Sequence, residues 1–121
     1  MLNLICTYLA LSESINHEKI VSFCESIRLH QEILNIPDGY NSFIGDSGIK
    51  VSGGQRQLIG FIRALYKNPD VLLIDEGTSS MDPELESKIQ YVLKCFFPQL
   101  AIIVATHGAE WDSAATKTIR L

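Results

Sequence analysis

Several features that mark particular classes of protein are missing from this 121-residue chain. It has no basic tract and a net charge of −4, so we expect no binding to nucleic acid through a charged surface. No stretch reaches the roughly 18 consecutive apolar residues of a membrane-spanning helix. Cys6, Cys24 and Cys95 are too widely spaced for a metal site or a disulfide framework, which is typical of a reducing cytoplasm.

The composition is that of a folded protein. Hydrophobic residues make up 46% of the chain and charged residues 20%, enough for the core of one small domain or of part of a larger one. Residues 1–14 show no clear pattern and lack the basic start and cleavage site of a signal peptide. We predict an α/β fold over residues 15–121, with a helical part at about 15–67 followed by parallel strands alternating with helices at about 70–121.

The helical part begins with a capping residue. Asn16 is a plausible cap for a helix from His17 onward, and apolar residues then recur at helical spacing, predicting a buried face. The apolar face continues through Ile33, Leu34 and Ile36 until the turn signal Pro37-Asp38-Gly39-Tyr40.

A Ser-Gly-Gly-Gln turn then opens a second helix, which Asn68-Pro69 ends. Ser52 can cap this helix, and Gly53 and Gly54 lack a Cβ, so another molecule can approach the backbone. A helix N-terminus with unpaired N–H groups suits a phosphate. Taken alone, however, such a turn is more often only a turn.

An apolar strand follows, Val71 to Ile74, and it ends in two carboxylates. The continuous apolar run predicts a strand buried on both faces of a parallel sheet. Asp75 and Glu76 then lie at the carboxyl edge, where open α/β sheets bind ligands and where carboxylates suit Mg²⁺ and a water nucleophile. Taken alone, the pair fits a solvated loop better.

The rest of the chain repeats the strand-and-helix pattern. Asp82 can cap a helix that starts at Pro83, and an apolar run from Leu100 to Ala105 predicts a second buried strand. His107 follows that strand and points towards the same ligand edge. Residues 117–121 suggest the start of another strand.

The order and spacing of these pieces resemble the ATP-binding-cassette (ABC) ATPases, a family with a P-loop NTPase-like fold. The resemblance implies that Ser52, Gly53, Gly54 and Gln55 form the signature motif, which binds the γ-phosphate of ATP held by an opposite subunit. It also implies that Asp75 binds Mg²⁺ through water and that Glu76 polarises the attacking water. His107 would contact the γ-phosphate and that water. The D-loop at the dimer interface would consist of Ser79, Ser80 and Asp82.

The resemblance also implies partners: a second nucleotide-binding domain and the transmembrane domain of an exporter, at the cytoplasmic face of a membrane. A free fragment would be cytosolic. Residues 42–48, with Asp46, resemble the exporter loop that contacts the transmembrane coupling helices. The run from Ile36 to Gln57 favours type I exporters, including those that secrete peptides such as bacteriocins.

One departure from the family changes the expected activity. No Gly-x-x-x-x-Gly-Lys-[Ser/Thr] motif occurs, so the sequence resembles the C-terminal part of a nucleotide-binding domain. We expect no ATP binding or hydrolysis by this chain alone, and exposed apolar surface that favours aggregation or a partner. In addition, Gly77 replaces the usual Pro, which should loosen the loop after Glu76.

Two other functions fit part of this pattern. The chain is alternatively a non-catalytic remnant or regulatory partner of a complete cassette. A DNA-repair-type ABC ATPase is disfavoured, because no heptad run occurs and the charge balance is acidic.

Overall fold

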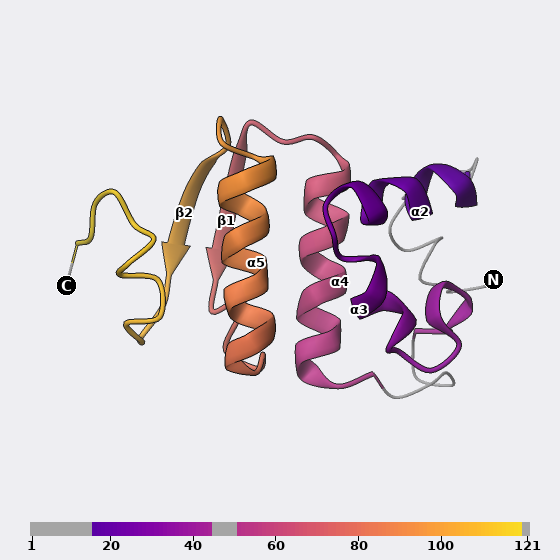
Figure 1. Ribbon diagram of the computed structural model, residues 1–121. Helices are drawn as coiled ribbons and strands as arrows, with labels where there is room; N and C mark the ends of the chain where they lie inside the picture. Colours follow the sequence, from indigo (N-terminus) through magenta and orange to yellow (C-terminus); the bar gives the residue numbers. More distant parts are fainter. Residues whose placement is uncertain (1–15, 45–50, 120–121) are drawn as a thin grey trace.

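The computed structural model describes residues 16–44 and 51–119 (Figure 1). The predicted α/β class is confirmed, since helices come first and two parallel strands joined by a helix follow. The predictions for residues 1–14 and for the exporter-like loop around Asp46 concern residues outside this description. The elements in chain order are α2 (His17–Ser26), α3 (His30–Leu34), a 3₁₀ turn (Gly39–Asn41), α4 (Gly53–Tyr66), β1 (Val71–Asp75), α5 (Pro83–Phe96) and β2 (Ala101–Ala105).

Helices α2 and α3 form a small helical layer. The Asn16 side chain accepts a hydrogen bond from the Lys19 N–H at 3.0 Å, which confirms the predicted cap. Arg28 has a φ of 61° between the two helices, where the chain changes direction. The predicted apolar face reaches Ile36, which is buried like Ile33, but Leu34 does not belong to it because its side chain is 48% exposed. Within the described residues, no helix combines the length and apolarity needed to cross a bilayer.

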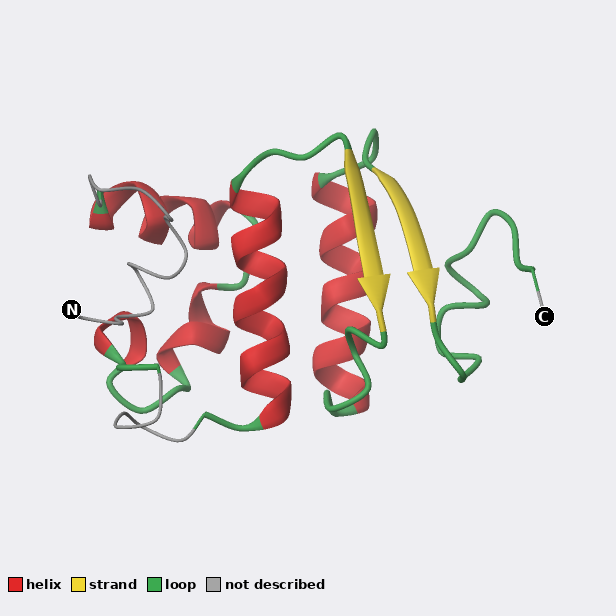
Figure 2. Cartoon of the chain, turned by 180° about the vertical axis from the view of Figure 1, so that it is seen from behind, coloured by secondary structure: helices red, strands yellow, loops and turns green. Residues whose placement is uncertain are grey.

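Helix α4 lies between this helical layer and α5, and α5 lies against one face of the sheet (Figures 1 and 2). The hydrophobic core runs through the helical layer of α2 and α3, through α4 and through α5, because each of them contributes an apolar stripe. The largest fully buried side chains are Ile20, Leu29, Ile33, Ile36, Leu58, Ile59, Ile62, Leu65, Ile89 and Val92.

The two strands are parallel, with Val71 paired to Ala101 and Asp75 to Ala105. Burial alternates along β1, so the prediction of a strand buried on both faces is wrong. The prediction of a second buried strand is wrong as well, because the residues of β2 are exposed or only partly buried. Leu73 is 72% exposed and its neighbour Ile103 is 61% exposed. The reason is that the helices cover one face of the sheet only, and the face turned to the viewer in Figure 2 carries no described element.

The chain after β2 differs from the prediction of a further strand. Residues 117–119, the described part of that segment, have no strand structure. Trp111, the only tryptophan of the chain, is instead buried in a turn after β2, and its indole N–H donates to the hydroxyl of Thr78 at 3.2 Å. This contact fastens the segment after β2 to the loop after β1.

Candidate functional site

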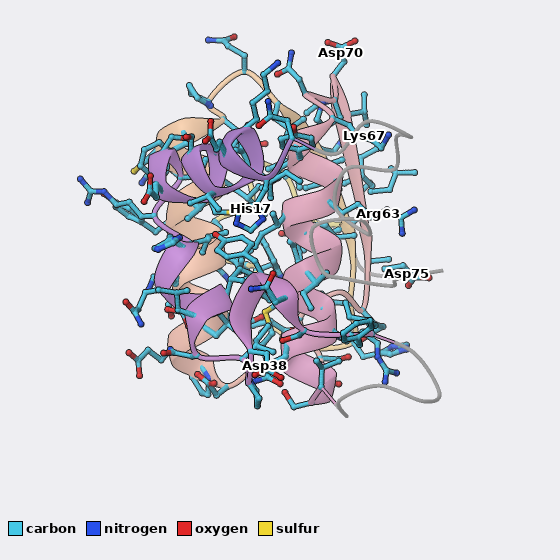
Figure 3. All side chains as sticks on the ribbon, turned by 90° about the vertical axis from the view of Figure 1, so that its right-hand side faces the viewer. His17, Asp38, Arg63, Lys67, Asp70 and Asp75 are labelled. Carbon is cyan, nitrogen blue, oxygen red and sulfur yellow. The ribbon has the colours of Figure 1, made fainter. Side chains whose placement is uncertain are left out.

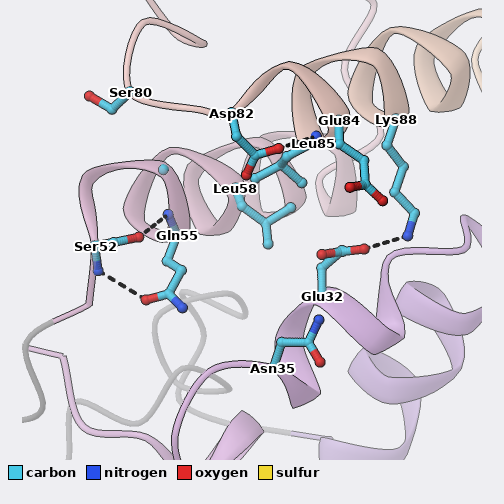
Figure 4. A pocket seen from close by; sticks show the side chains of 11 residues that line it. Glu32, Asn35, Ser52, Gln55, Leu58, Ser80, Asp82, Glu84, Leu85 and Lys88 are labelled. Carbon is cyan, nitrogen blue, oxygen red and sulfur yellow. Dashed lines mark hydrogen bonds and ion pairs between the residues drawn. The ribbon is translucent and has the colours of Figure 1, made fainter.

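The turn at Ser52 opens α4 with a complete capping box. The Ser52 hydroxyl accepts from the Gln55 N–H at 3.1 Å, and the Gln55 side chain accepts from the Ser52 N–H at 2.9 Å (Figure 4). Two backbone donors are thereby satisfied. The hydroxyl proton of Ser52 and the first-turn N–H groups of Gly53 and Gly54 point to no acceptor in the helix itself, so they suit an anion.

The two glycines are needed first by the protein's own chain. A Cβ on Gly54 would lie 2.8 Å from the carbonyl oxygen of Ser80, and a Cβ on Gly53 would lie 2.9 Å from the Ser80 Cβ. Real Cβ atoms do not approach backbone so closely. In the structure the chain's own loop around Ser80 makes the close approach that these glycines permit, and the approach of another molecule stays a prediction. This loop and the signature turn form one surface.

Gln57 joins this surface to the end of β1, and the sequence analysis assigned it no role. Its amide nitrogen donates to the carbonyl oxygen of Glu76 and to the hydroxyl of Ser79, both at 3.1 Å. Its amide oxygen accepts from the N–H of Ser80 at 3.0 Å. A glutamine two residues after the signature turn was the available signal, but its partners lie 19 to 23 residues away in the chain.

Glu76 occupies the carboxyl edge of the sheet with a left-handed backbone, at a φ of 50°. Its N–H continues the sheet ladder to the Ala105 carbonyl oxygen at 2.9 Å. Its carboxylate accepts from the backbone N–H of His107 at 3.0 Å, and the nearest imidazole nitrogen of that residue lies at 3.7 Å. The structure thus brings Glu76 and His107 together, and the imidazole itself is fully exposed.

Asp75 is the last residue of β1, and its exposed side chain projects from the side of the molecule (Figure 3). Within the described ranges, no three His, Cys, Asp or Glu side chains are grouped so that they could hold a metal ion. Mg²⁺ does not require such a cage, because it keeps several waters and binds one or two carboxylates plus substrate phosphates. The exposed carboxylate of Asp75 therefore fits Mg²⁺ in that mode.

The loop from Gly77 to Asp82 is held at several points. The backbone N–H of Ser79 donates to the Glu76 carbonyl oxygen at 3.2 Å, and that of Met81 to the Thr78 carbonyl oxygen at 3.0 Å. Asp82 caps α5 by accepting from the Leu85 N–H at 2.9 Å. A Cβ on Gly77 would lie 2.7 Å from a methyl group of Ile74, so this glycine packs closely. These contacts hold the loop, and its loosening relative to a Pro at position 77 stays a prediction.

A pocket of about 350 Å³ opens beside the signature turn (Figure 4). Lys88 on α5 pairs there with Glu32 on α3. The lining residues are Glu32, Asn35, Ser52, Gly54, Gln55, Leu58, Ser80, Asp82, Glu84, Leu85 and Lys88. The predicted site residues thus fall into two main groups: Ser52, Gly54, Gln55, Ser80 and Asp82 line this pocket, whereas Asp75, Glu76 and His107 lie at the sheet edge. The other two lie between these groups, with Gly53 against Ser80 and Ser79 bonded to Gln57.

The segment after β2 carries a carboxylate with a shifted acidity. The Thr106 hydroxyl donates to Glu110 at 2.6 Å, and this hydrogen bond holds the pKa of the Glu110 carboxyl below its usual range. The Gly108 N–H donates to the same hydroxyl at 3.2 Å. The turn that carries His107 is therefore shaped by a local hydrogen-bond network that the sequence analysis did not detect.

Comparison with known proteins identifies the relatives of this chain. Residues 11–79 match a family model described as ABC transporter. The chain is 38% identical over 96 residues to an ATP-dependent lipid A-core flippase of Syntrophus aciditrophicus, covering 79% of this chain and 16% of that protein. It is 42% identical over 94 residues to the multidrug resistance protein pgp-1 of Caenorhabditis elegans, covering 77% of this chain and 7% of that protein.

A solved structure agrees with these relatives. The fold matches a bacterial Atm1-family ABC exporter with ATP bound, at a TM-score of 0.73 and 26% sequence identity, covering 88% of this chain and 19% of the exporter chain. The chain therefore spans less than a fifth of the length of each protein named here.

Proposed function

This chain belongs to the ABC transporter family, and from that premise we propose that it supplies the signature surface and the catalytic carboxylate of an ATPase that drives export across a membrane. One observation carries the proposal. The helix that begins at the signature turn is joined through Gln57 to the backbone of Glu76 and to Ser80, and Gly54 packs directly against the loop from Gly77 to Asp82. Phosphoryl transfer depends mainly on such positioning and on neutralised charge.

The residues divide the chemistry between two places. Ser52, Gly53 and Gly54 present a hydroxyl and two N–H donors at the positive end of α4, which suits the γ-phosphate of ATP held by another subunit. Glu76, at the sheet edge beside His107, has the position of a group that orients and polarises an attacking water. Mg²⁺ held at Asp75 through water would neutralise charge on the phosphates of the nucleotide.

The proposal includes partners, because the 121 residues hold no Gly-x-x-x-x-Gly-Lys-[Ser/Thr] motif to cradle the phosphates. We expect a second nucleotide-binding domain to supply that loop, and a transmembrane domain to place the pair at the cytoplasmic face of a membrane. The finer assignment to exporters of peptides such as bacteriocins stays a prediction, since the relatives named above are described as a lipid A-core flippase, a multidrug resistance protein and an Atm1-family exporter.

A mixing experiment tests the proposal. The purified chain is added to a nucleotide-binding domain that carries a phosphate-binding loop, and Mg-ATP binding and hydrolysis are measured. We expect neither for the chain alone, and binding and hydrolysis above the partner's own level in the mixture. Ser52→Ala should abolish the gain in both binding and hydrolysis. Glu76→Gln should leave the gain in binding and reduce the gain in hydrolysis, because the carboxylate acts on the attacking water. Ser26→Ala and Glu25→Gln, at two exposed side chains of α2 away from the pocket, are the matched controls.

The same variants separate the second candidate function, a non-catalytic regulatory partner of a complete cassette. The missing phosphate-binding motif favours that alternative. A regulatory partner offers only its signature surface, so the gain would require Ser52 and be indifferent to Glu76. Tight Mg-ATP binding by the chain alone, or a gain that neither variant reduces, would contradict both functions.

A further inference from the structure

Gln57 has a set of hydrogen bonds unlike that of the other helical glutamines whose contacts are described. Gln31 bonds only to Asn35 on the next turn of its own helix, and Gln90 makes one bond to the Glu110 carbonyl oxygen. Gln57 makes three, using its amide nitrogen twice and its amide oxygen once. Both N–H donors of the amide are therefore committed, and the acceptor is occupied as well.

All three partners lie between Glu76 and Ser80, at the end of β1 and in the loop that follows it. The amide nitrogen holds the carbonyl oxygen of Glu76 and the hydroxyl of Ser79, and the amide oxygen holds the N–H of Ser80. Glu76 has a positive φ, a conformation that residues other than glycine keep only when surrounding contacts determine it. The Glu76 carbonyl oxygen accepts from two donors, Gln57 and the Ser79 N–H, which provides such contacts.

Helix α4 extends this connection to the signature turn. Gln57 lies in the second turn of α4, and the capping box of Ser52 and Gln55 defines the first. Because a helix with satisfied backbone bonds is stiff, displacement of its first turn moves the Gln57 amide with it. The Ser80 carbonyl oxygen also packs directly against Gly54, so the signature turn cannot move towards the loop without displacing it.

We propose that Gln57 is a positioning residue that locks the backbone of Glu76 and the Ser79–Ser80 loop to the signature helix, so that a displacement at the Ser52 turn is transmitted to Glu76. The inference rests on the proposed function for its consequence. In that function the signature turn faces a nucleotide held by a partner, whereas Glu76 lies at this chain's own sheet edge, so Gln57 would couple the partner's nucleotide to the carboxylate of this chain.

The coupling can be tested in the 121-residue chain without any nucleotide. Amide hydrogen exchange is measured by NMR at Ser79 and Met81, whose acceptors, Glu76 and Thr78, lie within the loop and survive in every variant. Gln57→Met keeps the volume and removes the three hydrogen bonds, and we expect exchange at both amides to rise about tenfold. Gln31→Met, which removes one exposed bond on α3, should leave them unchanged.

A double-mutant cycle then isolates transmission from local packing. Ser52→Ala removes the cap and should raise exchange at Ser79 in the presence of Gln57, but should add much less when Gln57→Met is already present, because only the contact between Gly54 and Ser80 then joins the turn to the loop. Equal effects of Ser52→Ala in both backgrounds, or no effect of Gln57→Met, would overturn the proposal. These exchange measurements use no ATP, so they test the role of Gln57 even where the mixing experiment above fails.

Gln57→Glu keeps the test decisive if Gln57→Met unfolds the chain, which would speed exchange in the buried core at Ile89 as well. The glutamate keeps an acceptor for the Ser80 N–H and loses the donors to Glu76 and Ser79. Exchange should therefore stay slow at Ser80 and rise at Ser79; a rise at neither would contradict the proposal. In an active mixture, a positioning role lowers kcat and leaves KM unchanged.

Discussion

Gly54→Ala tests whether the glycines of the signature turn are required by the protein's own packing. The new Cβ would lie 2.8 Å from the Ser80 carbonyl oxygen, 3.4 Å from the Met81 Cα and 3.5 Å from the Ser80 carbonyl carbon. All three are backbone atoms, which cannot rotate away as a flexible side chain can. The loop or the start of α4 must therefore shift, and overpacking of this kind costs about 1–3 kcal/mol.

Gly60→Ala is the matched control, because it is the same substitution on the same helix. A Cβ at Gly60 meets nothing within 4 Å. The only effect there is the helix propensity of alanine, which stabilises by about 1 kcal/mol relative to glycine. The two variants should thus move stability in opposite directions, by about 2–4 kcal/mol relative to each other.

Urea unfolding measures this difference with two signals. Far-ultraviolet circular dichroism reports the helices, and the fluorescence of Trp111, buried against Thr78, reports the loop after β1. We expect Gly54→Ala to lower the midpoint and to change Trp111 emission already in the folded state. A Gly54→Ala protein as stable as Gly60→Ala, with unchanged emission, would refute the argument that Ser80 fills the space beside Gly54.

Three further predictions follow from exposure and acidity. Leu73→Thr, on the open face of the sheet, should reduce self-association measured by light scattering, because it removes exposed apolar surface. Burial raises the pKa of the Cys24 thiol, so the folded state favours the neutral form. The stability that this gives the folded state is present below the ordinary thiol pKa and is lost as pH rises through the raised value. Cys24 should also be alkylated far more slowly than exposed Cys95. Thr106→Val should raise the pKa of Glu110 towards its usual value in an NMR titration, since the hydroxyl that stabilises the carboxylate is lost.

Each of these predictions has a contradicting outcome. Self-association reduced equally by Leu34→Thr, a side chain exposed on α3, would show that the sheet face is not special. Stability that falls as steeply at high pH in Cys24→Ala as in the natural chain would remove the thiol as the cause. An unchanged Glu110 titration in Thr106→Val would mean that the Thr106 hydroxyl is not what lowers its pKa.

Local signals made the elements of this fold predictable from the sequence. Ser52 and Asp82 each accept a backbone N–H at the start of a helix, where their side chains and the following Gly and Pro indicated a cap. Asp75 and Glu76 lie at the end of a strand because an apolar run precedes them. These features depend on neighbours within four residues, which the sequence displays directly.

Features that depend on the layers around an element were predicted less well. Leu72 and Leu73 are the same residue type in the same apolar run, yet one is buried and the other is 72% exposed. The alternation arises because α5 covers only one face of β1, and composition cannot distinguish a strand covered on one face from a strand covered on both. The same limit explains Leu34, which lies in an apolar run but faces away from the core.

The signature turn shows most clearly what a sequence pattern leaves open. Two glycines at a helix start predict that something approaches the backbone, and both a phosphate and another part of the chain satisfy that prediction. The distance of 2.8 Å between a Cβ on Gly54 and the Ser80 oxygen decides part of the question, because it gives the glycine a partner before any ligand binds. A nucleotide at Ser52 would then press on a surface already packed against the loop of Glu76, and a substitution at Gly54 would disturb binding and catalysis together.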